Sequence, residues 1–108
     1  MPNLKVFVDD EALPRGLPAA GRNELRQVLI EHLNVPLAAC QVAVVPVQGL
    51  PDQPLANIEL SIMQHPDRTK EALSHLGAAL QAVMRSHADV HSAFRCTLIN
   101  PEAYVAMK

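Results

Sequence analysis

Hydrophobic and polar residues alternate in two short stretches of the chain, at residues 4–8 and 57–62. An apolar side chain at every second position is the pattern of a β-strand with one buried face. The apolar positions are Leu4, Val6 and Val8 in the first stretch and Ile58, Leu60 and Ile62 in the second. Two further runs, CQVAVVPV at 40–47 and residues 94–99, have the composition of strands, and Pro46 stands near the end of its run.

Two longer segments carry apolar residues at helical spacing instead. The first helix is predicted over 19–33, and Pro36 prevents its continuation. The second has Asp67 as its predicted N-cap. Its apolar stripe consists of Leu73, Leu76, Leu80, Val83 and Met84. Residues 87–91 are then expected to form a connection to the last strand.

The order strand-helix-strand therefore occurs twice in a single domain spanning 1–108, with pseudo-repeat halves 1–54 and 55–108. Leu4, Val6 and Val8 match Ile58, Leu60 and Ile62 at an offset of 54, and Val42 and Val44 match Cys96 and Leu98 at the same offset. The connections are long enough for parallel crossovers. We expect an α/β fold (two-layer α+β): a duplicated β-α-β unit forming a four-stranded mixed sheet with two helices on one face. Ferredoxin-like folds, with antiparallel pairing, have the same element order.

The other face of this sheet is predicted to need a cover. Apolar side chains are expected on it at Phe7, Val45, Met63 and Ile99. Because such a surface is unfavourable in water, we expect subunits to associate, which also suits a small chain with few aromatic residues.

Composition and charge narrow the function classes. The net charge is −2 at pH 7, and Lys and Arg are not clustered, which argues against a nucleic-acid partner. No stretch reaches the roughly 18 apolar residues of a membrane span, and no export signal opens the chain, so a cytoplasmic protein without a membrane partner is expected. Cys40 and Cys96 are expected to be reduced, buried thiols. His87 and His91 lack an evident third ligand, so neither a metal nor another cofactor is predicted.

Three sequence segments carry a resemblance to a known family: MPNLKVFV at the start, VAVVPV in the second strand and FRCTLINPEAY near the end. With the repeated strand-helix-strand pattern, the chain resembles the tautomerase superfamily over nearly its whole length. The resemblance implies removal of the initiator Met, a general-base role for the freed amine of Pro2, and a homotrimer.

The chemistry of an amino-terminal proline supports this implied role. A free α-amino group titrates near pH 8, and burial or a nearby cation favours its neutral form, which can accept a proton. If Met1 is retained, however, the nitrogen of Pro2 belongs to an amide and is not basic. A proline at position two is then simply a residue that follows the initiator Met.

Family members also supply cations that bind a substrate carboxylate and stabilise an enolate. This chain has Val35 where the resemblance places a lysine, and Gln41 where it places an arginine. Arg68 is the best remaining carboxylate binder, because its guanidinium binds carboxylates bidentately. The other candidate substrate-binding residues are Lys5, Arg95, Asn100 and Tyr104.

Each of these candidates also has an ordinary structural explanation. Arg68 is equally an exposed arginine in the first helical turn, and the strand cations are equally solvated or interface charges. The sequence thus supports a tautomerase-like isomerase acting on a small keto-enol substrate that bears a carboxylate. The alternative is a non-catalytic, small oligomeric α/β protein that binds a ligand or partner.

Overall fold

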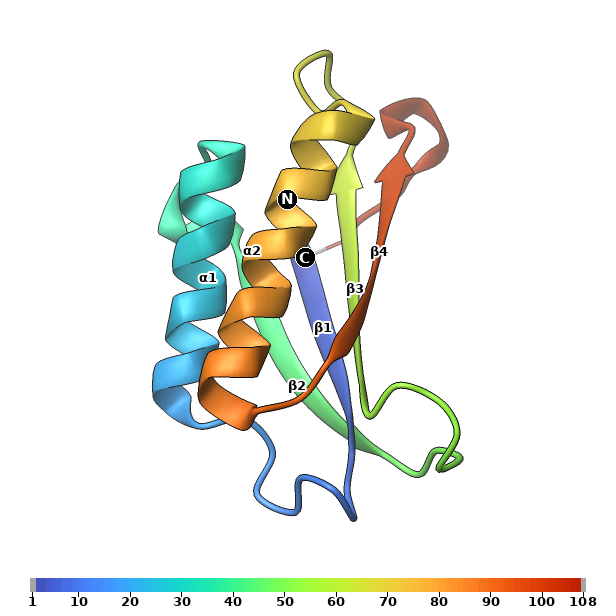
Figure 1. Cartoon of the computed structure of the whole chain (residues 1–108). Coiled ribbons are helices and arrows are strands. Elements are labelled where there is room, and N and C mark those ends of the chain that lie inside the picture. The colour runs from blue at the N-terminus through green and yellow to red at the C-terminus, as the bar shows by residue number, and fades with distance from the viewer. Residues whose placement is uncertain (1, 108) are drawn as a thin grey trace.

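Two helices pack on one face of a four-stranded sheet, as the computed structural model shows for residues 2–107 (Figure 1). The strands are β1 (Asn3–Asp9), β2 (Gln41–Val47), β3 (Ala56–Met63) and β4 (Ser92–Ile99). The helices are α1 (Ala19–Leu33) and α2 (Lys70–Ala88). Two short 3-10 turns, η1 (Leu37–Ala39) and η2 (Pro101–Ala103), precede β2 and follow β4.

The sheet has the order β2-β1-β3-β4. β1 pairs with β2, and β3 with β4, in parallel, as the two long crossovers predict. The two halves meet where β1 pairs with β3 in antiparallel fashion. This mixed pattern confirms the predicted duplicated unit and rules out the fully antiparallel ferredoxin-like pairing.

The core lies between the sheet and the helices. β1 and β3 present alternate residues to it, and these residues are almost completely buried: Leu4, Val6 and Val8 in β1 and Ile58, Leu60 and Ile62 in β3. The helices complete the core with Leu25, Leu29, Leu76, Leu80 and Met84. Since burying one such side chain contributes roughly 1.5–3 kcal/mol, the central strands and the helix stripes supply most of the apolar stabilisation.

The start of α2 differs from the sequence prediction. The N-cap is Thr69, whose hydroxyl accepts a hydrogen bond from the Ala72 N–H at 3.1 Å, and Asp67 contacts His65 instead. The prediction of Asp67 was wrong because the chain makes one further turn, closed by the Arg68 N–H and the His65 carbonyl, before it enters the helix.

The end of α2 also lies further along the chain than expected. The helix includes His87, which was assigned to the following connection, and ends at Ala88, before a left-handed Asp89. His87 Nε2 contacts the Glu24 carboxylate of α1, a long-range contact between the two helices. This contact between the helices involves a residue that local sequence placed in a loop.

The repeat needs one correction in its second strands. In register, Val42 is opposite Leu4, and Phe94 is opposite Ile58, so Val42 is equivalent to Phe94, 52 positions later. The offset of 54 paired Val42 with Cys96, which is one full strand period too far. Alternation with a period of two makes offsets of 52 and 54 equally consistent with the pattern, and only the pairing distinguishes them.

The sheet face opposite the helices carries apolar pairs and a charged row. Phe7 lies opposite Val45, and Met63 lies opposite Ile99, so the four predicted apolar side chains form two separate pairs. Between the pairs, neighbouring strands place Lys5, Glu59 and Arg95 side by side, and all three are exposed. We call these three residues the charged row.

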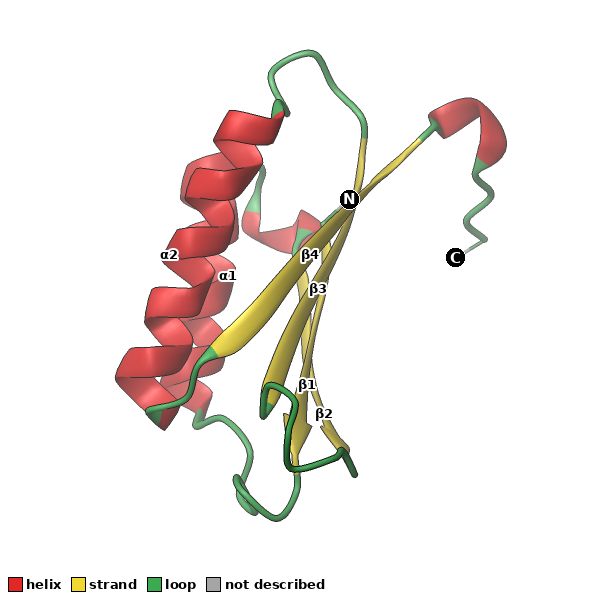
Figure 2. Ribbon diagram, turned by 45° about the vertical axis from the view of Figure 1, so that its right-hand side comes forward, coloured by secondary structure: helices red, strands yellow, loops and turns green. Residues whose placement is uncertain are grey.

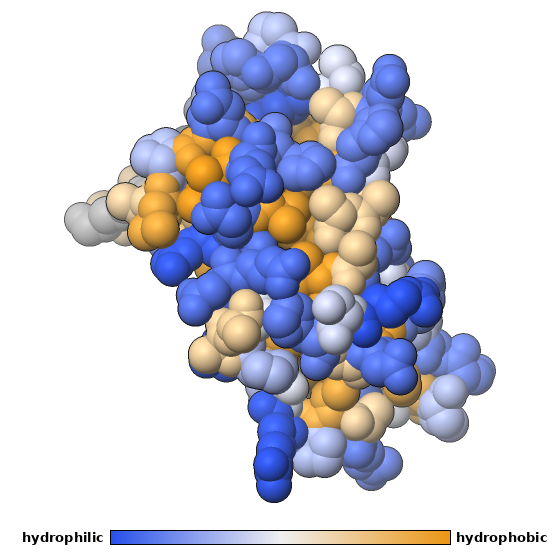
Figure 3. Space-filling model, turned by 60° about the vertical axis from the view of Figure 1, so that its left-hand side comes forward, coloured by the Kyte–Doolittle hydropathy of each residue, from blue (hydrophilic) through white to orange (hydrophobic). Residues whose placement is uncertain are grey.

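The surface near α1 and β2 is mostly hydrophilic, with smaller hydrophobic patches between the polar residues (Figure 3). Exposed residues of α1 include Arg22, Asn23, Glu24, Gln27 and Glu31. Among residues 2–107, no helix combines the length and apolar character needed to cross a membrane.

Helix α2 packs close to β4 at Gly77. A Cβ atom at this position would lie 2.4 Å from Cδ2 of Phe94, well inside van der Waals contact. We expect Gly77→Ala to destabilise the protein by about 1–3 kcal/mol in urea unfolding, although alanine favours helix elsewhere. In the double variant with Phe94→Leu, the added cost of Gly77→Ala should shrink; an unchanged cost would contradict the proposed clash.

Asp9 connects two loops at the far end of β1. Its Oδ1 accepts hydrogen bonds from the N–H groups of Glu11 and Ala12, and its Oδ2 accepts one from Gly49. The bond from Ala12 is the largest cause that lowers the pKa of Asp9 below its ordinary value of 3.8; desolvation opposes it, and the bonds from Glu11 and Gly49 add to the lowering. The ionised carboxylate therefore stabilises the folded loops.

This linkage has a definite sign. Because the folded pKa lies below 3.8, the stabilisation is complete above that pH and is lost as the pH falls through the folded pKa. Asp9→Asn should therefore lower Tm at neutral pH and weaken the decrease of Tm on acidification below about pH 4. Thermal melts across pH measure this, with Asp10→Asn as the control; an identical acid profile for wild type and Asp9→Asn would contradict the assignment.

Candidate active site

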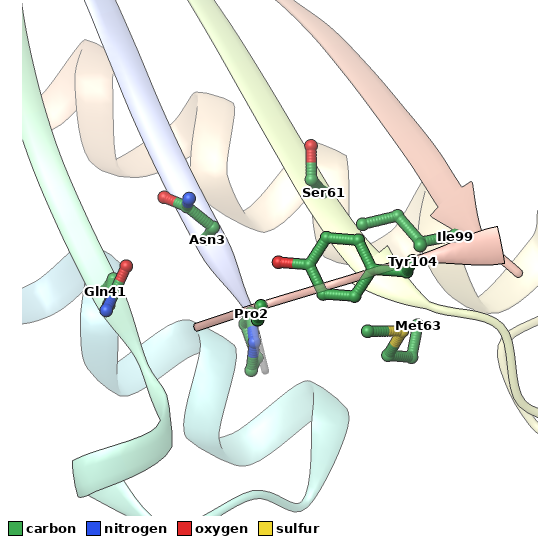
Figure 4. Close-up of a pocket in the computed structure, with 8 residues that line it drawn as sticks. Pro2, Asn3, Gln41, Ser61, Met63, Ile99 and Tyr104 are labelled. Atoms are coloured by element: carbon green, nitrogen blue, oxygen red, sulfur yellow. The ribbon is translucent and has the colours of Figure 1, made fainter. Parts of the chain in front are cut away.

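A cavity of about 560 Å³ opens at the end of the sheet where β1 begins (Figure 4). Its wall is made by residues from four strands, from the residue preceding β1 and from the C-terminal tail: Pro2, Asn3, Gln41, Ser61, Met63, Ile99, Tyr104 and Ala106. This volume lies in the range of small-molecule sites, roughly 300–1,000 Å³. Pro2 and Tyr104 are the two sequence-predicted site residues that line it.

The antiparallel pairing of β1 with β3 builds this cavity. It places the beginning of β1 beside the end of β3, so that Asn3 lies opposite Ser61. Parallel pairing then adds Gln41 beside Asn3 on one side and Ile99 beside Met63 on the other. All four strands thus contribute a residue to one end of the open face.

The C-terminal tail covers part of the same end. After β4 the chain turns through η2 on the side of the sheet away from the helices (Figure 2). The Asn100 side chain caps this turn by accepting a hydrogen bond from the Glu102 N–H at 3.1 Å. Asn100 itself does not line the cavity, but the turn that it caps leads directly to Tyr104, whose ring reaches toward Pro2 (Figure 4).

Pro2 is buried and is held in place by the main chain. Its carbonyl accepts a hydrogen bond from the Gln41 N–H at 3.0 Å, at the point where the β1–β2 pairing begins. The proline ring also fixes its own φ, so the strand sets the position of its nitrogen. The predicted removal of Met1 concerns a residue outside the described part of the chain.

Arg68 lies outside this cavity. Its Nη1 donates to the Met63 carbonyl at 2.5 Å, and the side chain borders a smaller hollow beside the C-terminal end of α1, lined also by His32 and Asn34. It precedes the N-cap of α2 and does not belong to the helix. The structure therefore does not bring Arg68 together with Pro2 in one cavity wall.

Lys5 and Arg95 face the same side of the sheet as the cavity but belong to the charged row. Lys5 lies directly opposite Glu59, and Arg95 lies opposite Glu59 on its other side. Arg95 Nη1 also donates to the Asn57 side-chain oxygen at 3.3 Å. Neither cation lines the cavity.

Sequence reasoning missed several lining residues. Ser61 was assigned only as a polar strand position, and Asn3 was not considered; Gln41 was considered only as a lost arginine. Strand alternation identifies the sheet face on which each residue lies. It does not show which ends of different strands meet, so nothing in the sequence distinguished these polar side chains from those at other strand positions.

Comparison with known proteins defines the class of this fold. No family model and no curated protein matches the sequence. Solved structures do match over nearly the whole chain. A macrophage migration inhibitory factor-like protein from Entamoeba histolytica is 15% identical, with a TM-score of 0.72 over 98% of this chain and 95% of that one.

Two more structures agree with that result. A wild-type fused 4-OT, solved as an asymmetric trimer, is 18% identical with a TM-score of 0.73, covering 96% of this chain and 91% of that one. A domain of unknown function, DUF1904, from Sebaldella termitidis is 17% identical with a TM-score of 0.72, covering 98% and 95%. The chain has the tautomerase-superfamily fold, as its sequence resemblance predicted.

Neither cysteine lies where it could act as a nucleophile in this cavity. Cys40 is buried, Cys96 is half-buried, and both are free thiols outside the cavity wall. Burial raises the pKa of each thiol above its ordinary value of 9.0, against the opposing charges of Arg26 near Cys40 and Arg68 near Cys96. Within residues 2–107, no three His, Cys, Asp or Glu side chains gather as a metal site would require.

The raised pKa values predict low thiol reactivity. Because only the thiolate attacks, the folded protein at pH 8 should react with a disulfide reagent at least tenfold more slowly than the same protein in urea. The release of the coloured thiolate from Ellman's reagent measures both rates, with Cys40→Ser and Cys96→Ser assigning each phase. Equal rates in the folded and unfolded protein would contradict the burial of these thiols.

Proposed function

We propose that this protein is a tautomerase that moves a proton between carbon and oxygen of a small keto-enol substrate, with the nitrogen of Pro2 as general base. The observation that carries the proposal is the position of Pro2: buried, and in the wall of the largest cavity described, on a tautomerase-superfamily fold. Removal of Met1 is part of the proposal, because it turns the amide nitrogen of Pro2 into a secondary amine.

Burial supports the required protonation state. A desolvated amine is less easily protonated, so the freed nitrogen of Pro2 is available as a base near neutral pH. In the enol-to-ketone direction, the nitrogen accepts the hydroxyl proton and delivers it to the neighbouring carbon, while the electron pair of the double bond forms the new carbon–hydrogen bond. The reaction neither oxidises nor reduces the substrate.

The remaining wall supplies hydrogen bonds to the oxygen that becomes charged. Asn3, Gln41 and Ser61 offer side-chain donors on three neighbouring strands, and Tyr104 adds a phenol from the tail. Donors aimed at a developing enolate stabilise the transition state more than the ground state. We assign Tyr104 to substrate binding and Asn100 to positioning it through η2.

We also propose that the protein works as a homo-oligomer in the cytoplasm, with the trimer as the expected form. The open sheet face carries the Phe7–Val45 and Met63–Ile99 pairs, which a second copy would remove from water. One solved structure with this fold is itself a fused 4-OT trimer. Oligomerisation would also cover the exposed Val105 and Met107 of the tail.

The base assignment is testable by changing only the nitrogen of Pro2 from an amine to an amide. Untagged wild type that has lost Met1, as intact mass shows, should ketonise phenylenolpyruvate or its methyl ester above the buffer rate. The same chain carrying an uncleaved glycine before Pro2 keeps every side chain but has an amide nitrogen. Its kcat/KM should fall by about 10²–10⁴-fold, the usual contribution of a general base.

A second variant checks that the loss comes from the base. Pro2→Ala with a free amine should retain part of the activity, whereas Pro36→Ala, outside the cavity, should behave as wild type. Full activity in the glycine-extended protein would remove Pro2 from the mechanism. Absence of turnover in a wild type shown to lack Met1 would favour the non-catalytic binding protein.

A further inference from the structure

Arg68 is the one residue of its loop that folds back against the protein. From Gln64 to Lys70 every other residue is exposed, whereas Arg68 is half-buried. Its N–H closes a turn on the His65 carbonyl, and its Nη1 donates to the Met63 carbonyl at 2.5 Å. The guanidinium is therefore fixed at the end of β3, on the main chain of a residue that lines the cavity.

The direction of the Met63 carbonyl follows from the peptide bond that it shares with Gln64. The Gln64 N–H donates to the Ile99 carbonyl of β4 at 2.9 Å. In a trans peptide the N–H and the C=O point in opposite directions, and no peptide bond within residues 2–107 is cis. The Met63 carbonyl therefore points away from β4, toward the side on which β1 lies.

Pro2 lies at the end of β1 toward which this carbonyl points. One residue before Asn3, the register of β1 and β3 puts Pro2 opposite Ile62, the neighbour of Met63. Only one interstrand spacing, about 4.8 Å, separates the two strands at this point. Pro2 and Met63 accordingly line the same cavity (Figure 4), and the guanidinium bound to Met63 is brought close to Pro2.

The charge of Arg68 acts from the helix side of the sheet. Burial raises the pKa of Cys96, and the charge of Arg68 opposes this rise. Cys96 lies opposite Leu60, a core residue, so its thiol is on the helix side. The tail that covers the cavity lies on the other side (Figure 2), so Arg68 approaches the start of β1 from behind the cavity wall.

We propose that Arg68 is a positioning residue for Pro2: its guanidinium, held on the Met63 carbonyl, keeps the freed Pro2 nitrogen uncharged and able to accept a proton. The inference rests on the proposed function in taking Pro2 as a free amine. A nearby positive charge disfavours the protonated form of an amine, and water and salt screen partly buried charges little. This role differs from the carboxylate binding that the resemblance implied for Arg68, because it needs no contact with the substrate.

Other charged or titratable groups surround this end of the sheet. They are Arg26 and His32 of α1, Cys40 before β2, His65 and Asp67 of the loop after β3, Lys5 and Glu59 of the open face, and Tyr104 of the tail. All of them stay the same when only Arg68 is replaced. A comparison of wild type with Arg68 variants at one ionic strength therefore isolates the charge of Arg68.

The protonation of Pro2 can be followed directly by ¹⁵N NMR. In protein labelled with ¹⁵N-proline and shown by intact mass to begin at Pro2, as expressed or after methionine aminopeptidase, one of the nine proline nitrogens is an amine. Arg68→Gln should raise the pH midpoint of this amine by about 1 unit, because loss of a nearby positive charge makes protonation easier. Arg85→Gln, which removes an equal charge from the last turn of α2, should leave the midpoint unchanged.

Two more variants separate charge from structure. Arg68→Lys keeps a cation and should return the midpoint at least half way to wild type. Arg68→Met keeps an apolar stem without the charge, and it takes the place of Arg68→Gln if thermal melts show the glutamine variant to be unfolded. An unshifted midpoint in the folded neutral variant, an equal shift in Arg85→Gln, or a lysine variant that matches the neutral one overturns the inference.

Turnover separates this inference from the proposed function. The methyl ester of phenylenolpyruvate has no carboxylate for Arg68 to bind, so kcat/KM for the ester in Arg68→Gln should be lower at acidic pH and not lower above both midpoints. A shifted midpoint without turnover in any variant would reject the tautomerase and keep the role of Arg68. Turnover that depends on Pro2, with an unshifted midpoint and an equal loss of kcat/KM at every pH, would keep the tautomerase and reject the role of Arg68.

Discussion

The antiparallel pairing of β1 with β3 is the contact on which the rest of the structure depends. Each half of the chain can form a parallel strand pair with its own crossover helix. In either half alone, however, the inner strand (β1 or β3) would have one edge without a neighbouring strand. Joining them places two alternating apolar faces side by side beneath the two helices, where their side chains are almost fully buried. The same pairing brings the first residues of β1 beside the last residues of β3, and so creates the cavity.

This arrangement divides the open face of the sheet into regions of different chemistry. The cavity takes the end where Pro2 lies, and the charged row crosses the middle of the sheet. Lys5 and Glu59 occupy equivalent positions in the two halves, at the offset of 54, and they also lie opposite each other in register. The charged row is therefore centred on the point about which the two halves are related. Opposite charges at this point favour the pairing of the two halves.

Periodicity predicted most of the fold because burial acts on single elements. The alternation at residues 4–8 and 57–62 and the stripe of α2 each depend on one face meeting the core, so each was visible locally. Asp67 was wrongly chosen as a cap because Asp67 and Thr69 are both good N-caps, and the turn ahead of the helix selects between them. The repeat offset of the second strands was wrong by one strand period for a similar reason, since two registers bury the same face.

The candidate site depended more on tertiary structure. By sequence alone, Pro2 and Tyr104 were identifiable through a resemblance at the two ends of the chain, and the strand faces of Lys5 and Arg95 followed from alternation. Only the folded chain separated Arg68 from the cavity and brought Ser61, Gln41 and Met63 into its wall, because these positions meet through pairing between strands distant in sequence. Local pattern determines which face a side chain occupies, whereas long-range pairing determines its neighbours, and the chemistry of a site is set by neighbours.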